Sequence, residues 1–290
     1  MSWRTVVVTK TAKLDLKLNY LVIRSNEILK INLSEISTLI IESTSVSITS
    51  ALLCEMIKNK IKIIFCDEKR NPQSELTPYY GSHDTSAKVR SQVTWNEHIK
   101  TLVWTQIVTE KIRNQKRFLE KLNKTEADLL NNYLNEINLG DTTNREGHSA
   151  KVYFNALFGK DFSRSKEDII NISLNYGYSI ILSAFNREIV ANGYITQLGL
   201  FHNNMFNQFN LSSDLMEPYR TLIDQKVYYM RPEKFERDEK LELVNVLNSE
   251  IMIEGKTQYV NNAIKIYCKS VFDALSENDV SKMRFYKDEL

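Results

Sequence analysis

The sequence has little glycine and proline: eight glycines and four prolines occur among its 290 residues. That share is roughly a third of average usage. Collagen-like, glycine-linker and proline-rich disordered chains are excluded, and an all-β sandwich is disfavoured because it needs many turn residues. With 42% hydrophobic and 26% charged residues, the composition is that of an ordinary folded protein of roughly two domains.

Cysteine is also scarce. Cys54, Cys66 and Cys268 are far apart and form neither a C-x-x-C pair nor a disulfide framework, so we expect buried thiols. The first ten residues lack the basic and long apolar regions of a signal peptide, and no apolar run reaches the roughly 18 residues of a membrane span. These absences predict a cytoplasmic protein without a membrane partner.

The common enzyme motifs are absent as well. The sequence contains no G-x-G-x-x-G, no G-x-x-x-x-G-K-[ST], no G-x-S-x-G and no H-E-x-x-H. It has four histidines and three cysteines but many carboxylates. If a metal binds, a hard divalent cation with oxygen ligands is therefore favoured over zinc, which prefers sulfur and histidine.

Short β-branched and apolar runs fill the first 66 residues. Each has three to six residues bounded by polar ones, which is typical of strands. Between the last two runs, Ile48, Leu52 and Met56 recur at every fourth position, so this segment predicts a helix packed on a sheet. The predicted strands are Val6–Val8, Tyr20–Arg24, Ile28–Ile31, Leu39–Ile41 and Ile61–Phe65.

From Asp84 onward the pattern is helical. Asp84 is a candidate N-cap for one segment that runs to about Leu122, and Ser165 with Asp168 resembles a capping box for a helix that runs to Gly193. Further predicted helices end at Gly140 and Gly159, and the last 60 residues continue the helical pattern with one turn at Gly255.

The predicted fold class is therefore α+β. A small β-rich domain occupies residues 1–70, and a linker with prolines and polar clusters occupies residues 71–83. A larger all-α domain, which would carry any catalytic site, occupies residues 84–290.

The net charge of +2 is unevenly distributed. Basic residues exceed acidic ones by eight over residues 1–124, whereas acidic residues exceed basic ones by six over residues 125–290. The basic excess peaks in KIRNQKRFLEKLNK, which contains Lys111, Lys116 and Arg117. This segment is either a solvated helix face or a helix that contacts nucleic-acid phosphates by displacing condensed counterions.

Two places combine chemistry-bearing residues with helix-start spacing or an isolated histidine. Thr143 and Glu146 have the spacing of a capping box, so Glu146 either caps its own helix or is a metal ligand at the helix start. His148 points to a different helix face and is a poor co-ligand. His202 lies in an apolar and amide-rich stretch with no acid beside it, which is typical of a structural histidine.

A third place holds two carboxylates. Asp214 and Glu217 are three residues apart and share one helix face, and Arg220 follows three residues later. The structural interpretation is an acidic pair favoured by the helix dipole, with an ion pair to Arg220. The functional interpretation is a pair that converges on a cation, with one carboxylate binding directly and the other supporting it. Residue pattern alone ends at a mainly helical two-domain protein with a candidate divalent-metal site.

Three segments in this order resemble one known family, the CRISPR-associated integrase that captures new spacers, in particular its compact type II version. They are NREGHSAKVYFNALFG at 144–159, LNYGYSIILSAFNREIVANGYITQLGLFHNN at 174–204, and LSSDLMEPYR at 211–220, followed by Asp224. The β-rich start, linker and helical remainder also match, so the resemblance covers essentially the full chain. Any one segment alone would be a weak signal, whereas their joint occurrence is specific.

The resemblance implies a catalytic site for Mg²⁺ or Mn²⁺ with Glu146, His202 and Glu217 as ligands. Asp214 matches the family's additional acidic position beside the site. Many family members carry aspartate where this chain has Glu217, whose longer side chain still reaches a cation. Which of Asp214 and Glu217 coordinates directly is left open.

The resemblance also implies the reaction and the partners. A 3′-hydroxyl of a short double-stranded protospacer attacks a phosphodiester at the border of a repeat in the CRISPR array, which is a transesterification. Two copies form a homodimer through the β-rich domain, and two such dimers flank a small dimeric adaptation protein in a heterohexamer. A ring-forming DNA-end-binding accessory protein and an effector nuclease take part as well.

DNA contacts are predicted from basic and aromatic residues near these segments. Tyr153 and Tyr176 either stack on splayed bases or pack in the core. Two other functions stay open: a non-catalytic DNA-binding scaffold, whose acidic residues are helix caps, and a structure-specific DNA nuclease that uses water. The candidates for phosphate contact are Arg145, Arg187 and Arg220 near the site and Lys111, Lys116 and Arg117 on its flank.

Overall fold

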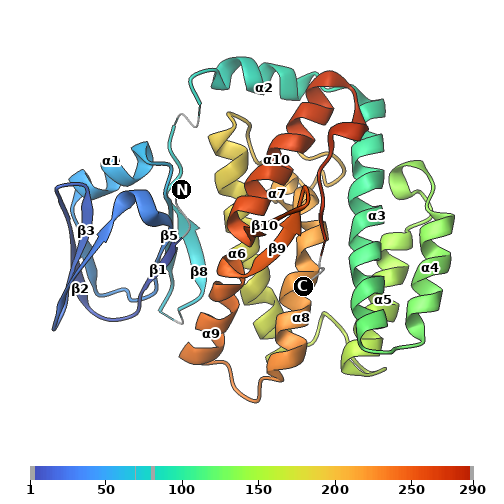
Figure 1. Ribbon diagram of the computed structural model, residues 1–290, viewed down its shortest axis with the longest axis horizontal. Helices are drawn as coiled ribbons and strands as arrows, with labels where there is room; N and C mark the ends of the chain where they lie inside the picture. Colours follow the sequence, from blue (N-terminus) through green and yellow to red (C-terminus); the bar gives the residue numbers. More distant parts are fainter. Residues whose placement is uncertain (1–3, 69, 80–81, 288–290) are drawn as a thin grey trace.

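The computed structural model describes residues 4–68, 70–79 and 82–287. Figure 1 shows a small β-rich body beside a larger helical body, and the two are joined by the chain between β8 and α2. The α+β class predicted from the sequence is confirmed. Two residues of the predicted linker, 80 and 81, lie outside the described residues.

Within the described residues, the β-rich body consists of two four-stranded sheets, the helix α1 and the 3₁₀ turn η1 (Leu33–Glu35). The sheet orders are β1-β5-β7-β8 and β4-β3-β2-β6. Helix α1 (Ser50–Lys58) buries Leu52 and Met56, as their spacing predicts, whereas Ile48, predicted in the same helix, lies in β6. The side chain of Thr49 caps α1 and accepts a hydrogen bond from the Leu52 amide. The strands are β1 (Arg4–Val8), β2 (Ala12–Lys17), β3 (Tyr20–Arg24), β4 (Ile28–Asn32), β5 (Ile36–Ile41), β6 (Val46–Ile48), β7 (Lys62–Cys66) and β8 (Pro72–Glu75).

Strand β5 connects the two bodies because both of its faces are buried. Side chains alternate across a strand, so Leu39 and Ile41 pack in the β-rich core while Ile40 packs with the helices. Ile64 of β7 also belongs to the helical core. The first sheet is therefore a wall shared by two hydrophobic cores.

Strand β8 lies within the segment that the sequence predicts as linker. It pairs antiparallel with β7, with Glu75 opposite Ile64. The Glu75 carboxylate forms an ion pair with buried Lys62 and accepts hydrogen bonds from Ser183 and Asn186 of the helical body. Edge pairing is compatible with Pro72 because an edge strand need not donate every amide.

The helical body contains two long helices, α3 and α6, and shorter helices pack against them. The predicted segment from Asp84 to Leu122 is in fact two helices, α2 and α3. They separate at Trp95, which is buried against Tyr194 at 5.3 Å between ring centroids, and Asn96 then caps α3. The helices are α2 (Thr85–Val93), α3 (Glu97–Lys121), α4 (Glu126–Glu136), α5 (Arg145–Phe158), α6 (Ile169–Ala191), α7 (Asn210–Leu215), α8 (Arg220–Met230), α9 (Arg237–Val244) and α10 (Val260–Glu277).

Helix α6 is one unbroken element. Its N-cap is Asp168, whose side chain accepts a hydrogen bond from the Asn171 amide, so the predicted capping box starting at Ser165 is wrong. Gly177 sits inside the helix because a Cβ there would come within 2.5 Å of Ile223 Cγ2. This glycine permits close packing of α6 against α8.

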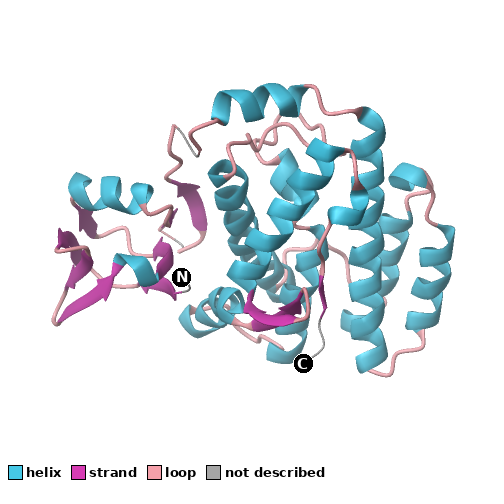
Figure 2. Ribbon diagram, turned by 45° about the horizontal axis from the view of Figure 1, so that its top comes forward, coloured by secondary structure: helices cyan, strands magenta, loops and turns pink. Residues whose placement is uncertain are grey.

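The helical body also contains a small sheet, so the predicted all-α domain is incomplete. Strands β9 (Glu250–Ile253), β10 (Lys256–Tyr259) and β11 (Tyr286–Lys287) pair antiparallel in the order β10-β9-β11. A two-residue turn at Glu254 and Gly255, with φ of +51° and +70°, joins β9 to β10 and suits a hairpin. Figure 2 shows this sheet at the base of the helical body, apart from the other strands.

Among the described residues, no helix is both long and apolar enough to cross a membrane.

Candidate active site

Glu146 reaches the site from the first turn of α5. The helix is capped by other residues: the Asn144 side chain accepts from the Gly147 amide at 3.2 Å, and Asp141 accepts from the amides of Arg145 and Glu146. The predicted capping box of Thr143 and Glu146 is therefore wrong. Because the cap is complete without it, the Glu146 carboxylate is available for another partner.

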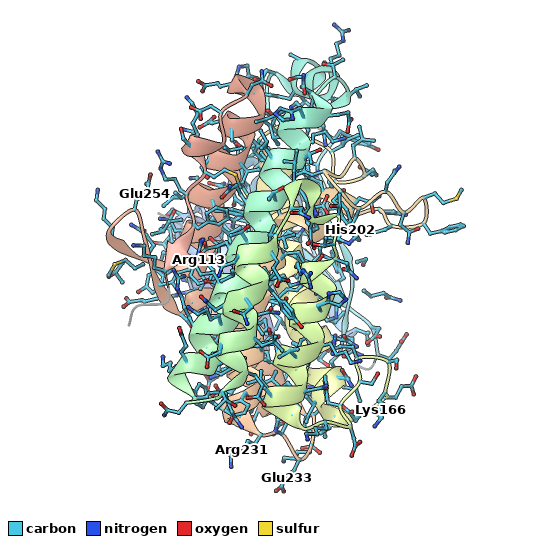
Figure 3. The ribbon with its side chains drawn as sticks, turned by 90° about the vertical axis from the view of Figure 1, so that its right-hand side faces the viewer. Arg113, Lys166, His202, Arg231, Glu233 and Glu254 are labelled. Carbon is cyan, nitrogen blue, oxygen red and sulfur yellow. The ribbon has the colours of Figure 1, made fainter. Side chains whose placement is uncertain are left out.

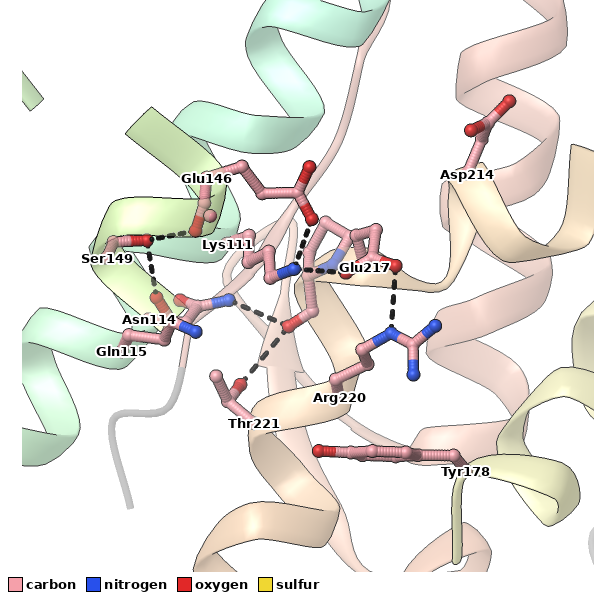
Figure 4. Close-up of polar contacts among 12 residues, drawn as sticks. Lys111, Asn114, Gln115, Glu146, Ser149, Tyr178, Asp214, Glu217, Arg220 and Thr221 are labelled. Atoms are coloured by element: carbon pink, nitrogen blue, oxygen red, sulfur yellow. Dashed lines mark hydrogen bonds and ion pairs between the residues drawn. The ribbon is translucent and has the colours of Figure 1, made fainter. Parts of the chain in front are cut away.

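That partner is Lys111 of α3. Its ammonium lies 2.6 Å from Glu146 Oε1 and 2.5 Å from Glu217 Oε2, so one cation bridges the two carboxylates (Figure 4). Glu217 begins the 3₁₀ turn η3 (Glu217–Tyr219), and its other oxygen accepts a hydrogen bond from Arg220 Nε at 2.8 Å. The predicted ion pair between Glu217 and Arg220 is thus present.

Burial and charge act in opposite directions on this cluster. Burial alone would lower the pKa of Lys111, but the charges of Glu217 and Glu146 outweigh burial and raise it. Burial would raise the pKa of Glu217, yet Arg220 and Lys111 together hold it at about 2. Lys111, Glu217 and Arg220 are therefore ionised at neutral pH, and each is stable in the interior because of its oppositely charged neighbours.

His202 lies in the irregular segment between α6 and α7, and Asp214 of α7 holds it. His202 Nδ1 is 2.5 Å from Asp214 Oδ1, and Asp214 also accepts from the amides of Leu200, Phe201 and His202. The hydrogen bond to Asp214 raises the pKa of His202. Figure 3 shows His202 at the edge of the helical body beside α3 and α5.

Gly199 makes this arrangement possible. A Cβ there would come within 2.3 Å of the His202 carbonyl oxygen and 2.7 Å of Asp214 Oδ2. The backbone of Leu200 to His202 can then fold over the carboxylate and donate its amides to it.

The roles of the two acids on the DLMEP segment are therefore different. Asp214 is fully buried, and both of its oxygens accept hydrogen bonds from residues 200–202, which we call the histidine loop. Figure 4 shows Asp214 set apart from the bridge that joins Glu146, Lys111 and Glu217. This geometry favours Glu217 as the acid that faces a cation and Asp214 as the acid that orients His202.

The predicted metal ligands do not form a ready-made cage. Among the described residues, no group of three or more histidine, cysteine, aspartate and glutamate side chains is arranged to hold a metal ion. The donor set nonetheless fits a divalent cation, because an ammonium already stands between Glu146 and Glu217 where such a cation would bind. The two carboxylates are donors that Mg²⁺ and Mn²⁺ prefer, and His202 would add a nitrogen donor of the kind that transition metals accept.

Arg220 and Arg164 stack on Tyr178 beyond this bridge. The guanidinium carbons lie 4.7 Å and 5.3 Å from the ring centroid, respectively. The Tyr178 hydroxyl donates to Asp224, and burial raises the pKa of this carboxyl to about 7. Residue pattern gave no reason to select Arg164 or Tyr178, because both lie among ordinary helix-start and core residues.

Several predicted DNA contacts are corrected by their surroundings. Lys111 is 7% exposed and belongs to the site, so it is not part of a basic flank. Tyr153 and Tyr176 are 0% and 4% exposed, so neither presents a ring face for base stacking and both pack in the core. Arg187 donates to the Ser37 carbonyl and pairs with Glu188, so the structure uses it to join the two bodies.

The other basic candidates stay near the surface. Arg145 pairs with Glu136 at 2.9 Å and lies over the ring of Tyr133. Lys116 pairs with Glu120, and Arg117 pairs with Glu110. A DNA contact by these residues stays a prediction.

Comparison with known proteins identifies relatives over most of the chain. The family model described as CRISPR associated protein Cas1 matches residues 5–250. A CRISPR-associated endonuclease Cas1 from Neisseria meningitidis serogroup C is 33% identical over 261 residues, which cover 88% of this chain and 86% of the relative.

Solved structures share the fold at low identity. A casposase bound to integration product matches with a TM-score of 0.78 and 18% identity, covering 100% of this chain and 96% of that one. A Cas6-RT-Cas1–Cas2 complex matches with a TM-score of 0.74 and 16% identity over 99% of this chain, which spans 36% of the matched chain.

Proposed function

The chain belongs to the family of CRISPR-associated Cas1 proteins, and from this premise we propose that it is a metal-dependent DNA integrase. It would insert short foreign DNA into a CRISPR array through attack of a 3′-hydroxyl on a phosphodiester. The observation that carries the proposal is the Lys111 ammonium held between Glu146 and Glu217. Beside it lies His202, which buried Asp214 orients.

Glu146, Glu217 and His202 are the residues that would hold Mg²⁺ or Mn²⁺. When bound, the ion would stabilise charge on the phosphoryl oxygens and lower the pKa of the attacking hydroxyl. Asp214 accepts a hydrogen bond from His202 Nδ1–H, which would leave Nε2 as the ligand nitrogen. Arg220 keeps Glu217 ionised and places a guanidinium beside the position of the phosphate.

Partners follow from the same premise. We propose a homodimer joined through the β-rich domain, and two dimers around a small dimeric adaptation protein in a heterohexamer. A Cas1–Cas2 complex among the structures of the same fold supports this pairing, and a casposase holding an integration product supports integration chemistry on this fold. Accessory DNA-end-binding and effector proteins would join this assembly.

The scaffold alternative required the acidic residues to be helix caps. Asn144 and Asp141 cap α5 instead, and Glu146 is directed to Lys111. A scaffold has no use for a buried carboxylate and a half-buried one that share the Lys111 ammonium, since burying charge costs free energy. The nuclease alternative uses the same residues and differs only in its product.

The test is strand transfer into a supercoiled plasmid that carries the repeat, with Mg²⁺ present. Glu146→Gln should reduce branched product by more than the roughly 10–100-fold that is typical of losing an outer partner of a metal ligand. Glu120→Gln is the matched control, because Glu120 lies on the exposed face of α3 and pairs with Lys116. Wild-type levels of branched product in Glu146→Gln would refute the proposal, and cut ends without joints would indicate a nuclease.

A further inference from the structure

A cavity opens on the inner side of the glutamate pair. Its volume is about 230 Å³, and Lys111, Gln115, Arg164, Tyr178, Glu217 and Arg220 contribute to its walls. With about 30 Å³ for each water, this space has room for a phosphate group and part of its sugar. The cavity is continuous with the candidate active site because Glu146 and Glu217 line it as well.

Two guanidinium groups are fixed on this wall before any ligand arrives. Arg220 and Arg164 both lie over the Tyr178 ring, and the Tyr178 hydroxyl is tied to buried Asp224. Arg164 also donates to the side chains of Asn171 and Asn175 of α6. Because their conformations are already restricted, binding an anion would cost little side-chain entropy.

Several donors in this cavity have no hydrogen-bond partner among the described residues. Arg220 uses Nε for Glu217, while its two terminal nitrogens make no hydrogen bond within the described part of the chain. Gln115 is 2% exposed, and its oxygen accepts from Ser149. The Gln115 amide nitrogen has no partner in the described ranges, yet it is not among the fully enclosed atoms, so it borders the cavity.

The chemistry of these donors suits a singly charged phosphodiester. A guanidinium fork matches two phosphate oxygens, and an amide nitrogen adds a neutral donor. Lys111, Arg164 and Arg220 bring three positive charges against the two glutamates and Asp224. Since Asp224 is largely protonated below pH 7, the cavity favours one added negative charge.

We propose that this cavity is a subsite for one backbone phosphate of the DNA strand that enters the candidate active site. Arg220 is its fork and Gln115 is its neutral donor. Arg164, whose terminal nitrogens are held by Asn171 and Asn175, supplies positive charge and acts as a positioning residue. The subsite rests on the proposed function, which makes DNA the substrate.

The experiment measures DNA binding by fluorescence anisotropy in the presence of a chelator, at several salt concentrations. Arg164→Met should flatten the slope of log affinity against log salt by about 0.7–0.9, the value of one phosphate contact. Lys166→Met is the matched control. It removes a charge from the same loop, but Lys166 is exposed, binds the Asp161 carbonyl and lies outside the cavity (Figure 3).

A second arm locates the phosphate. Neutral methylphosphonate groups replace single phosphates along the strand, one at a time. At one position the replacement should weaken binding to the wild type and have no further effect on Arg164→Met, while Lys166→Met behaves like the wild type. Gln115→Leu should weaken binding at that position without changing the salt slope.

Two results would overturn the subsite. One is an equal salt slope for Arg164→Met and Lys166→Met. The other is that the effects of methylphosphonate and of Arg164→Met on binding add at every position of the strand. If inorganic phosphate then raises the melting temperature of the wild type, the cavity binds a free anion and not a DNA phosphate. Because no divalent ion is present, these results are independent of whether strand transfer occurs.

Discussion

The carboxylate pair and the histidine of the candidate site are held in place by different interactions. Glu146 and Glu217 come from separate elements and depend on the charge of Lys111, which a third element supplies. His202 depends on hydrogen bonds within a short stretch of chain, because Asp214 accepts three successive amides as well as the imidazole. One half is fixed by tertiary charge compensation and the other by local backbone geometry.

This difference predicts how far the destabilisation caused by a substitution extends through the fold. Loss of the Lys111 charge leaves Glu146 and Glu217 with less charge compensation. It should destabilise the packing of α3, α5 and η3, which carry these three residues. Loss of a bond in the histidine loop should stay within the loop, because its partners are neighbours in the chain. The same cation site thus combines a part that is coupled to global stability with a part that is not.

The largest effect should come from removing the shared cation. Lys111→Met should lower the free energy of unfolding by about 3–5 kcal/mol in a chelator, because buried Glu217 loses one of its two cationic partners and half-buried Glu146 loses its ion pair. Urea unfolding monitored by circular dichroism measures this. Added Mn²⁺ should restore a larger part of the stability in the variant than it adds to the wild type.

Lys116→Met is the control for this substitution. It lies on the same helix, and its partner Glu120 is half exposed, so the cost should be below about 1 kcal/mol. If Lys111→Met unfolds like the control, the two halves of the site do not differ in the way described.

The next effect concerns Asp224 at the inner end of the charged half. Burial raises its pKa to about 7 from 3.8, so the folded state holds a proton that the unfolded chain releases. The stability that this proton contributes is present below pH about 4 and is lost as the pH rises through 7. At about 1.4 kcal/mol per unit, the loss reaches at most about 4 kcal/mol.

Asp224→Asn mimics the neutral acid and still accepts the hydrogen bond from Tyr178. The variant should therefore be more stable than the wild type at pH 8, and this advantage should shrink as the pH falls toward 5. Urea unfolding at the two pH values tests it. An advantage of equal size at both would show that Asp224 does not titrate as described.

The smallest effect should come from the histidine half. Asp214→Asn keeps the shape but loses the charge, so it should cost about 1–3 kcal/mol and lower the pKa of His202 toward its ordinary value. Because the wild-type His202 pKa is raised, the ion pair stabilises the fold below pH about 6.5 and stops doing so as the pH rises through the raised pKa. The cost should therefore be larger at pH 6 than at pH 9.

An NMR titration of the histidine ring follows this change directly. Amide exchange should quicken at Leu200 to His202 and stay unchanged in α3 and α5. Faster exchange throughout the helices would mean that the loop is not held locally.

The fold was predictable where periodicity was strong. The patterns identified most of the helices and five strands, but β2, β6 and β11 were missed. The pair β9 and β10 was missed as well, although Ile251 and Ile253 alternate before the Glu254–Gly255 turn. Helical propensity on either side of this hairpin concealed it. Strand β8 was missed because its partner, β7, is what makes those polar residues a strand.

The site was predictable only in part. Family resemblance selected Glu146, His202 and Glu217, whereas spacing alone favoured caps and ion pairs. Lys111 was assigned to a basic run, although it lies four residues after Ile107 and seven before Phe118, on the buried stripe of α3. The bond from His202 to Asp214 joins residues twelve positions apart, across an irregular segment and most of α7, and residue pattern gave no sign of this return.

The wall shared by the two cores fixes the orientation of the β-rich body. Besides β5, buried hydrogen bonds join the bodies at Ser37, which accepts from Asn261 and Arg187. If two copies join through the β-rich domain as proposed, the separation of their catalytic centres is then set by rigid protein and not by a pliable connector. Such a dimer would hold its two sites at a fixed distance, and the DNA segments it captures would share one length.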